Sequence, residues 1–131
     1  MSENVAMTRI TQVGTIGVPV NDQDRALEFY RDKLGFETRM DATYGEGERW
    51  IEVAPPGAAT TIALVRAAAD QLTGTDTGVR LSTDDAAADH EALLARGVDA
   101  DAEVIPYPVP MFIMRDPDGN RLIVVERPPG L

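Results

Sequence analysis

The chain has 131 residues, of which 44% are hydrophobic and 26% charged, and this balance is typical of one globular domain with its own core. It contains no cysteine, which excludes a disulfide framework, a thiolate nucleophile and a cysteine-ligated metal site. The formal net charge of −10 and the scatter of the 12 basic residues make nucleic acids and anionic membranes poor partners. With no apolar run of membrane-span length and no signal-peptide pattern, we expect a cytoplasmic protein.

The first half of the chain predicts a strand, a helix and three more strands. Residues 1–9 are expected to form a flexible leader, and apolar side chains then alternate along Thr11–Val20 as on a strand with one buried face. Asn21-Asp22 supplies a helix N-cap, and the helix that follows has its apolar residues at helical spacing and ends at Gly35. The further predicted strands are residues 36–42, 49–53 and 61–65, joined by turns at 44–48 and 54–59.

The second half repeats this order. Asp84-Asp85 caps a second helix, and Asp85 lies 12 residues before Gly97, just as Asp22 lies 13 residues before Gly35. The other predicted elements are a strand at 78–83, an extended segment at 98–104, a loop at 106–110, strands at 111–114 and 121–126, a tight turn at 116–120 and a tail at 127–131. We therefore expect one α+β domain at residues 10–126, built from two βαβββ modules at 10–66 and 78–126. Helices on one face of each sheet leave the other face free to form a cavity wall.

Two segments resemble a known superfamily. Residues 18–37, VPVNDQDRALEFYRDKLGFE, are similar to the first module of the vicinal-oxygen-chelate superfamily, which includes glyoxalases, bleomycin-resistance proteins and extradiol dioxygenases. Residues 112–126, FIMRDPDGNRLIVVE, are similar to the end of its second module. The resemblance implies a curved, cavity-enclosing mixed sheet with the helices outside, and a homodimer. It also implies one of two kinds of site, because the enzymes hold a divalent metal whereas the antibiotic-binding members carry none.

The positions that ligate the metal in those enzymes carry poor ligands in this chain. The resemblance places them at Thr15, seven residues before Asp22; at Gly78, seven before Asp85; at Ile123, three after the Asn of DPDGN; and at Thr61 or Ala63. Zinc, nickel and iron prefer imidazole, carboxylate or thiolate ligands. We therefore expect no metal ligands and no cofactor at this site.

Strand alternation predicts which side chains pack under the helices and which face the cavity. The core set is Ile16, Val18, Ile51, Val53, Ile62, Leu64, Val79, Leu81, Leu122 and Val124. The cavity set is Thr15, Gly17, Trp50, Glu52, Thr61, Ala63, Arg80, Ser82, Ile123 and Val125, which Met111 and Ile113 are expected to join. This mixture of mostly apolar and a few polar side chains is typical of a small-molecule pocket.

Several residues of this set allow two interpretations. Trp50 can stack on a planar ligand or serve in core or dimer packing. Arg80 and Glu52 can pair with each other, or Arg80 can bind an anionic ligand group while Glu52, with its pKa raised by burial, acts as a general base.

Three residues outside the cavity set are expected to be structural. Tyr30 is expected in the core, His90 at the surface or edge of the second helix, and Glu126 at the surface or a dimer edge.

Three hypotheses follow. The first is a metal-free protein that holds a small, partly apolar or planar ligand. The residues expected to bind it are Thr15, Trp50, Glu52, Thr61, Arg80, Ser82, Met111, Ile113 and Ile123. The second is a glyoxalase-like lyase, isomerase or related enzyme with Glu52 as catalytic base or with an atypical metal site. The third is an accessory module that binds a partner protein.

Overall fold

The computed structural model describes residues 7–127 and contains two four-stranded sheets. The first sheet, in the order β1-β4-β3-β2, is made of β1 (Thr15–Val20), β2 (Glu37–Tyr44), β3 (Glu48–Ala54) and β4 (Thr61–Arg66). The second, in the order β5-β8-β7-β6, is made of β5 (Asp76–Thr83), β6 (Asp99–Ala100), β7 (Met111–Arg115) and β8 (Arg121–Glu126). The predicted α+β class and the two βαβββ units are confirmed. Of the predicted leader and tail, residues 1–6 and 128–131 lie outside the described residues.

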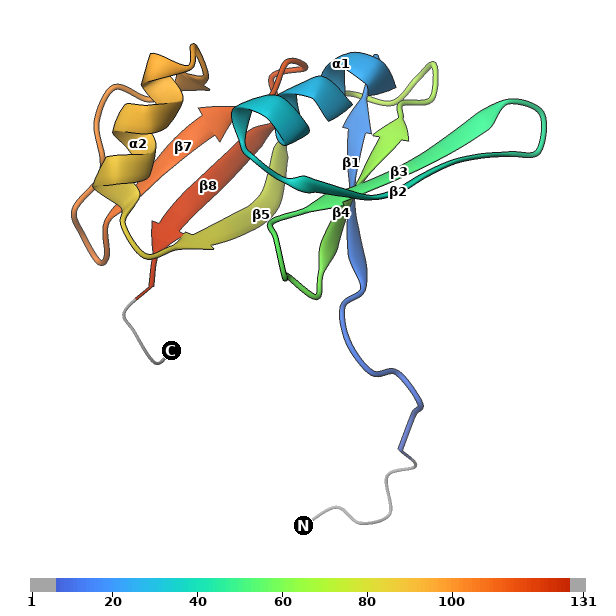
Figure 1. The fold of residues 1–131 in the computed structure, drawn as a ribbon, viewed down its shortest axis with the longest axis horizontal. Coiled ribbons are helices and arrows are strands. Elements are labelled where there is room, and N and C mark those ends of the chain that lie inside the picture. The colour runs from blue at the N-terminus through green and yellow to red at the C-terminus, as the bar shows by residue number, and fades with distance from the viewer. Residues whose placement is uncertain (1–6, 128–131) are drawn as a thin grey trace.

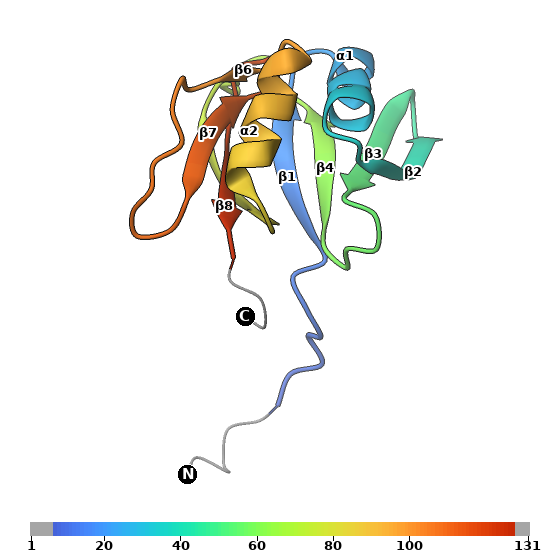
Figure 2. The ribbon, with the colours of Figure 1, turned by 60° about the vertical axis from the view of Figure 1, so that its left-hand side comes forward.

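The two sheets have the same topology. In each, the first strand runs parallel to the last, with Thr15 opposite Thr61 in one sheet and Arg80 opposite Ile123 in the other, and the remaining pairs are antiparallel. Both helices lie on the same side of the molecule, and the β2–β3 hairpin projects beyond the first sheet (Figure 1). Turning the molecule shows each helix beside its own sheet (Figure 2). Within the described residues, 7–127, the opposite faces of both sheets therefore carry no helix.

The helices begin and end where the sequence predicts. Asp22 accepts a hydrogen bond from the Arg25 amide at the start of α1 (Gln23–Glu28), and Asp85 accepts one from the Ala88 amide at the start of α2 (Ala86–Ala95). The first helix continues as a π-helical turn, η1 (Phe29–Lys33). Both helices are followed by a glycine with positive φ, at Gly35 (77°) and Gly97 (81°), as a left-handed C-terminal cap requires.

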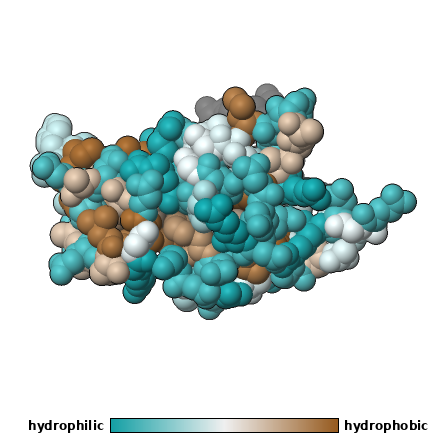
Figure 3. Space-filling model, turned by 90° about the horizontal axis from the view of Figure 1, so that it is seen from above, coloured by the Kyte–Doolittle hydropathy of each residue, from teal (hydrophilic) through white to brown (hydrophobic). Residues whose placement is uncertain are grey.

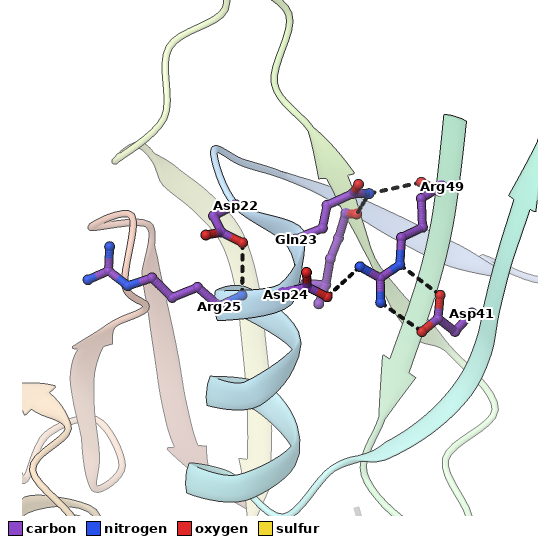
Figure 4. Close-up of polar contacts among 7 residues, drawn as sticks. Asp22, Gln23, Asp24, Arg25, Asp41 and Arg49 are labelled. Carbon is purple, nitrogen blue, oxygen red and sulfur yellow. Dashed lines mark hydrogen bonds and ion pairs between the residues drawn. The ribbon is translucent and has the colours of Figure 1, made fainter. Parts of the chain in front are cut away.

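Polar side chains fix the start of α1 against the first sheet (Figure 4). Gln23 Nε2 donates to the main-chain carbonyls of Arg49 and Leu64, at 2.8 and 2.9 Å. The Arg49 guanidinium forms a bidentate ion pair with Asp41 on β2, with both N–O distances at 2.9 Å, and also donates to the Asp24 carboxylate in the first turn of α1. The helix is thereby held across β3 and β2.

The predicted set of core residues is confirmed, although Thr61 and Ala63 of the predicted cavity set are buried as well. Eight of the ten side chains expected under the helices are buried, and the other two, Ile16 and Leu81, pack partly buried against them. Tyr30 is fully buried, as expected.

A buried polar network joins the two modules. The Tyr30 hydroxyl donates to Asp116 Oδ2 at 3.0 Å, across 86 residues of sequence. Asn120 is also fully buried: its Nδ2 donates to Asp116 Oδ2 at 3.0 Å and to the Pro19 carbonyl at 2.8 Å, and its Oδ1 accepts from the Gly74 and Thr75 amides. The DPDGN turn thus holds together the end of β1, residues 74–75 of the segment between β4 and β5, and the second sheet.

Two predicted boundaries were wrong. The first strand begins at Thr15 instead of Thr11, since ladder pairing with β4 begins at the Thr15–Thr61 pair. The segment 98–104 forms only the two-residue strand β6, because the chain bends at residues 102–103.

The helix-bearing face is covered mainly by hydrophilic residues, with smaller hydrophobic areas between them (Figure 3). Among residues 7–127, no helix is long and apolar enough to cross a membrane.

Candidate functional site

Four of the predicted site residues form a hydrogen-bonded chain on the helix-free face of the first sheet. Trp50 and Glu52 are two residues apart on β3, so their side chains emerge on the same face. Trp50 Nε1 donates to Glu52 Oε2 at 2.7 Å, and Thr61 Oγ1 on β4 donates to Glu52 Oε1 at 2.6 Å. Thr15 joins the chain from β1, where its Oγ1 donates to the Thr61 carbonyl at 3.2 Å. The indole ring of Trp50 is therefore held in place by a carboxylate that is itself held by a neighbouring strand.

The electrostatics of Glu52 are opposite to the expectation. Hydrogen bonds from Thr61 and, secondly, Trp50 lower the pKa of Glu52 below its ordinary value, and these outweigh the opposing effect of partial burial. The hypothesis that burial raises the pKa of Glu52 was wrong, because both carboxylate oxygens already accept a hydrogen bond. A carboxylate in this state is a weak general base.

A cavity of about 430 Å³ lies where the two modules meet. One wall is the loop after β3 with the beginning of β4, including Pro55, Thr60 and Thr61; the other is residues 79–82 of β5. The lining is mostly apolar, and its polar side chains are Thr60, Thr61, Arg80 and Ser82, three of them predicted site residues. A smaller cavity of about 230 Å³ on the helix side shares Pro55, Leu81 and Ser82 with it. Two cavities therefore lie along the seam between the modules.

Arg80 and Ser82 stand side by side on the helix-free face of β5. Arg80 Nη1 donates to the Gly78 carbonyl at 3.1 Å, which lays the guanidinium along its own strand. The Ser82 hydroxyl oxygen accepts from Arg127 Nε at 3.2 Å. Within residues 7–127 the Arg80 guanidinium forms no ion pair, so the alternative of an Arg80–Glu52 pair was wrong for the described part of the chain.

The remaining predicted site residues lie on the second sheet. Ile113 on β7 is opposite Ile123 on β8, and Met111 is opposite Val125. All four side chains are half-buried. They lie on the same face of this sheet as Arg80 and extend its apolar surface away from the seam. The lining of the 430 Å³ cavity includes none of these four, nor Trp50 or Glu52.

The positions of the enzymes' metal ligands do not make a metal site here. Thr15 and Thr61 lie opposite each other in the parallel β1–β4 pair, while Gly78, with a φ of 73°, has no side chain and Ile123 has no donor atom. No group of three or more His, Asp or Glu side chains able to hold a metal ion occurs between residues 7 and 127. Two threonine hydroxyls do not supply the imidazole or carboxylate ligands that zinc, nickel and iron need.

Two residues outside the cavity set are tied into the structure. His90 lies at the edge of α2, half-buried, with its Nε2 2.7 Å from the Asp101 carbonyl oxygen and its ring against Phe112. Glu126 Oε1 accepts a hydrogen bond from the Ala86 amide at 2.9 Å, so it caps the start of α2. Sequence reasoning placed His90 correctly at the helix edge but missed its partner, and it missed the capping role of Glu126.

The buried pair Tyr30 and Asp116 was also missed. Burial raises the pKa of Asp116, partly opposed by the hydrogen bonds it accepts from Asn120, Tyr30 and the Asp118 amide, and burial together with Asp116 raises the pKa of Tyr30. In the sequence, the residues DPDGN are fully explained as a tight turn. The only signal for a polar partner was the expected burial of Tyr30, because a buried hydroxyl needs a hydrogen-bond partner.

Fold and site together define a two-module α+β protein with a cavity at the junction of its modules. The chain belongs to the Glyoxalase/Bleomycin resistance protein/Dioxygenase superfamily, whose family model matches residues 12–124.

Among curated relatives, the uncharacterized protein YetH of Bacillus subtilis (strain 168) is 30% identical over 121 residues, which are 89% of this chain and 99% of YetH. The crystal structure of TnmS3, an antibiotic binding protein from Streptomyces sp. CB03234, is 34% identical, with a TM-score of 0.80 and coverage of 93% of this chain and 100% of TnmS3. A superfamily member from Sphaerobacter thermophilus DSM 20745 is also 34% identical, with a TM-score of 0.84 and coverage of 92% and 100%.

Proposed function

We propose that this chain is a metal-free small-molecule-binding protein that holds a partly apolar or planar ligand at the junction of its two modules. The observation that carries the proposal is the 430 Å³ cavity, whose volume is in the range of drug-sized sites. Its lining combines apolar side chains with Thr60, Thr61, Arg80 and Ser82 and, in the part of the chain that the structure describes, includes no His, Asp or Glu. TnmS3, which is 34% identical to this chain, is an antibiotic binding protein, and this supports the same interpretation.

Trp50 lies on the helix-free face of the first sheet, outside the lining of the junction cavity. Its Nε1 is engaged with Glu52, so the ring has a defined orientation on the same sheet face as Thr15 and Thr61. In this proposal Glu52 orients Trp50 and Thr61 and takes no proton from the ligand. This disfavours the enzyme hypothesis with Glu52 as catalytic base.

A ligand panel read by thermal unfolding tests the proposal. A ligand present at 100 times its Kd stabilises the folded state by about 2.7 kcal/mol, which raises Tm by something on the order of 10 °C for a domain of this size. Ala59 is exposed and lines the cavity, so Ala59→Trp is expected to fill the space and remove the shift. Ala95→Trp, at an exposed position on α2, is the matched control and should keep it. The proposal fails if no planar or apolar compound raises Tm, or if Ala59→Trp responds like the control.

The metal-free part has its own test. Elemental analysis after dialysis is expected to find less than one transition-metal ion per chain. One retained equivalent would contradict the argument from Thr15, Thr61, Gly78 and Ile123.

We also propose that the protein is a homodimer. Residues 7–14, which precede β1, extend away from both sheets (Figures 1 and 2), and three of their apolar side chains are strongly exposed: Met7 (91%), Ile10 (81%) and Val13 (66%). Covering such side chains in a second copy would be favourable. Light scattering coupled to size exclusion should give twice the chain mass of 14.2 kDa, and a monomer would contradict this proposal.

A further inference from the structure

The charge inside the junction cavity is opposite to the charge of the protein. The chain carries a net charge of −10, yet among residues 7–127 Arg80 is the one charged residue that lines the cavity. Arg80 is exposed at the rim of the cavity, so its guanidinium attracts an anion through solvent-screened electrostatics and through direct, charge-assisted hydrogen bonds. The cavity is therefore a local positive site within an acidic molecule.

Arg80 has donors to spare within the described part of the chain. One of its nitrogens, Nη1, donates to the Gly78 carbonyl of the same strand, which holds the side chain over the face without neutralising it. The nearest acid expected to pair with it, Glu52, has both oxygens occupied by Trp50 and Thr61. A guanidinium carries five N–H donors, so Arg80 keeps donors for a ligand.

Ser82 and Arg127 reinforce the same end of the cavity. Ser82 follows Arg80 by two residues on β5, so both side chains emerge on one sheet face. The Ser82 oxygen accepts from Arg127 Nε at 3.2 Å, which leaves the hydroxyl proton of Ser82 available as a donor. Arg127 thereby adds a second positive charge beside Ser82. Together, the side chains of Arg80, Ser82 and Arg127 offer N–H and O–H donors, and none of the three is acidic.

We propose that the ligand of the junction cavity is an organic anion, an apolar or aromatic body bearing a carboxylate. Its carboxylate binds Arg80 and Ser82, and its apolar body lies against Ile16, Pro55 and Leu81. This inference rests on the proposed binding function and adds the chemical class of the ligand. Carboxylate recognition by arginine is charge-assisted and can be bidentate, so it supplies selectivity as well as affinity.

A matched pair of probes tests the class. The anion 1-naphthoate and its neutral amide, 1-naphthamide, have nearly the same shape and differ in charge. Their Kd values are measured by isothermal titration calorimetry with the full-length protein, with Arg80→Gln and with Arg66→Gln. Arg66 is an exposed residue at the end of β4 that does not line the cavity. Arg66→Gln therefore changes the net charge by the same amount as Arg80→Gln without altering the cavity lining.

We expect the wild-type protein to bind 1-naphthoate at least about tenfold more tightly than 1-naphthamide, which corresponds to one charge-assisted hydrogen bond. Arg80→Gln should remove this preference by weakening 1-naphthoate alone, while Arg66→Gln keeps it. The overall negative charge favours the neutral amide, so the sign of the preference is informative.

Three results would overturn the inference. Equal binding of both probes, with binding still lost in Ala59→Trp, would refute the anionic class and leave the binding function standing. A naphthoate preference that survives Arg80→Gln would refute the role of Arg80. Binding of neither probe at millimolar concentration would count against the anionic class and the binding function together.

Discussion

Lys33 and Arg96 each donate a hydrogen bond to the main-chain carbonyl of the other, across the two modules. Lys33 Nζ lies 2.7 Å from the Arg96 carbonyl oxygen, and Arg96 Nη1 lies 2.9 Å from the Lys33 carbonyl oxygen. Both residues end a helix, where carbonyl groups lack helical partners and the helix dipole favours a positive charge. The pair therefore joins the modules by satisfying both helix ends at once.

Loss of one side of this pair should weaken the fold modestly. We expect Lys33→Met to lower the free energy of unfolding by about 0.5–1.5 kcal/mol, the usual net contribution of one hydrogen bond, here the bond to the Arg96 carbonyl. Arg31→Met is the control, because Arg31 bonds only to the adjacent Asp32 among the described residues. Urea unfolding measures both variants, and an equal effect of the two would contradict a specific role for Lys33.

Asn120 is expected to contribute much more to the stability of the fold than its position in a turn implies. Asn120→Ala leaves the Gly74 and Thr75 amides and the Pro19 carbonyl without their buried partner. We expect a loss of about 2–4 kcal/mol in the free energy of unfolding. Asn21→Ala, which removes an exposed amide bonded to Asp118 and Thr73, should cost clearly less. Equal costs in urea unfolding would show that burial of Asn120 does not decide its effect.

Tyr30→Phe should destabilise the protein more at neutral pH than in acid. Burial raises the pKa of Asp116, so the stability linked to its protonated form is complete below the ordinary pKa of about 3.9 and is lost as pH rises through the raised value. Removing the Tyr30 donor raises this pKa further, because the ionised carboxylate loses a hydrogen bond. We expect a cost of about 2 kcal/mol at pH 7 and about 1 kcal/mol near pH 4, from urea unfolding at both values. Tyr44→Phe, at an exposed position, should show no such dependence, and a cost for Tyr30→Phe independent of pH would argue against the linkage.

Thr61→Val should raise the pKa of Glu52 toward its ordinary value. Thr61 is the first cause of the lowered pKa, and valine has nearly the same shape without the hydroxyl. Because the pKa of Glu52 is lowered, its contribution to stability is present above the ordinary pKa and is lost as pH falls through the lowered value. Thr61→Val therefore moves that loss to higher pH. The carboxyl carbon chemical shift of Glu52, followed through a pH titration, gives the pKa directly. Thr60→Val is the control, since the Thr60 hydroxyl bonds to the Val13 carbonyl, and a similar shift there would exclude a specific Thr61–Glu52 bond.

Local patterns were enough to predict much of the fold. The period of two along β1, β3, β4, β5 and β8 gave the core face, because a buried sheet face needs an apolar side chain at every second residue. The helix ends followed from Asp22 and Gly35 and from Asp85 and Gly97, since capping depends only on nearby residues.

Contacts between distant segments could not be obtained in this way. Tyr30 and Asp116 are 86 residues apart, and nothing near either residue identifies the other. Whether Arg80 pairs with Glu52 or the two residues have separate partners depends on how the two sheets and their side chains are placed in space. Strand alternation could assign both residues to the cavity side. Only the three-dimensional arrangement shows that Glu52 accepts hydrogen bonds from Trp50 and Thr61 and that Arg80 lies beside the cavity.

An amide chemical-shift titration of the metal-stripped, isotope-labelled protein with 1-naphthoate is the most direct test that the module junction is the binding site. We expect saturable shifts that are concentrated at residues 59–62 and 79–82 and are unchanged when a chelator is present. Shifts centred elsewhere, or binding that requires an added metal ion, would contradict this expectation.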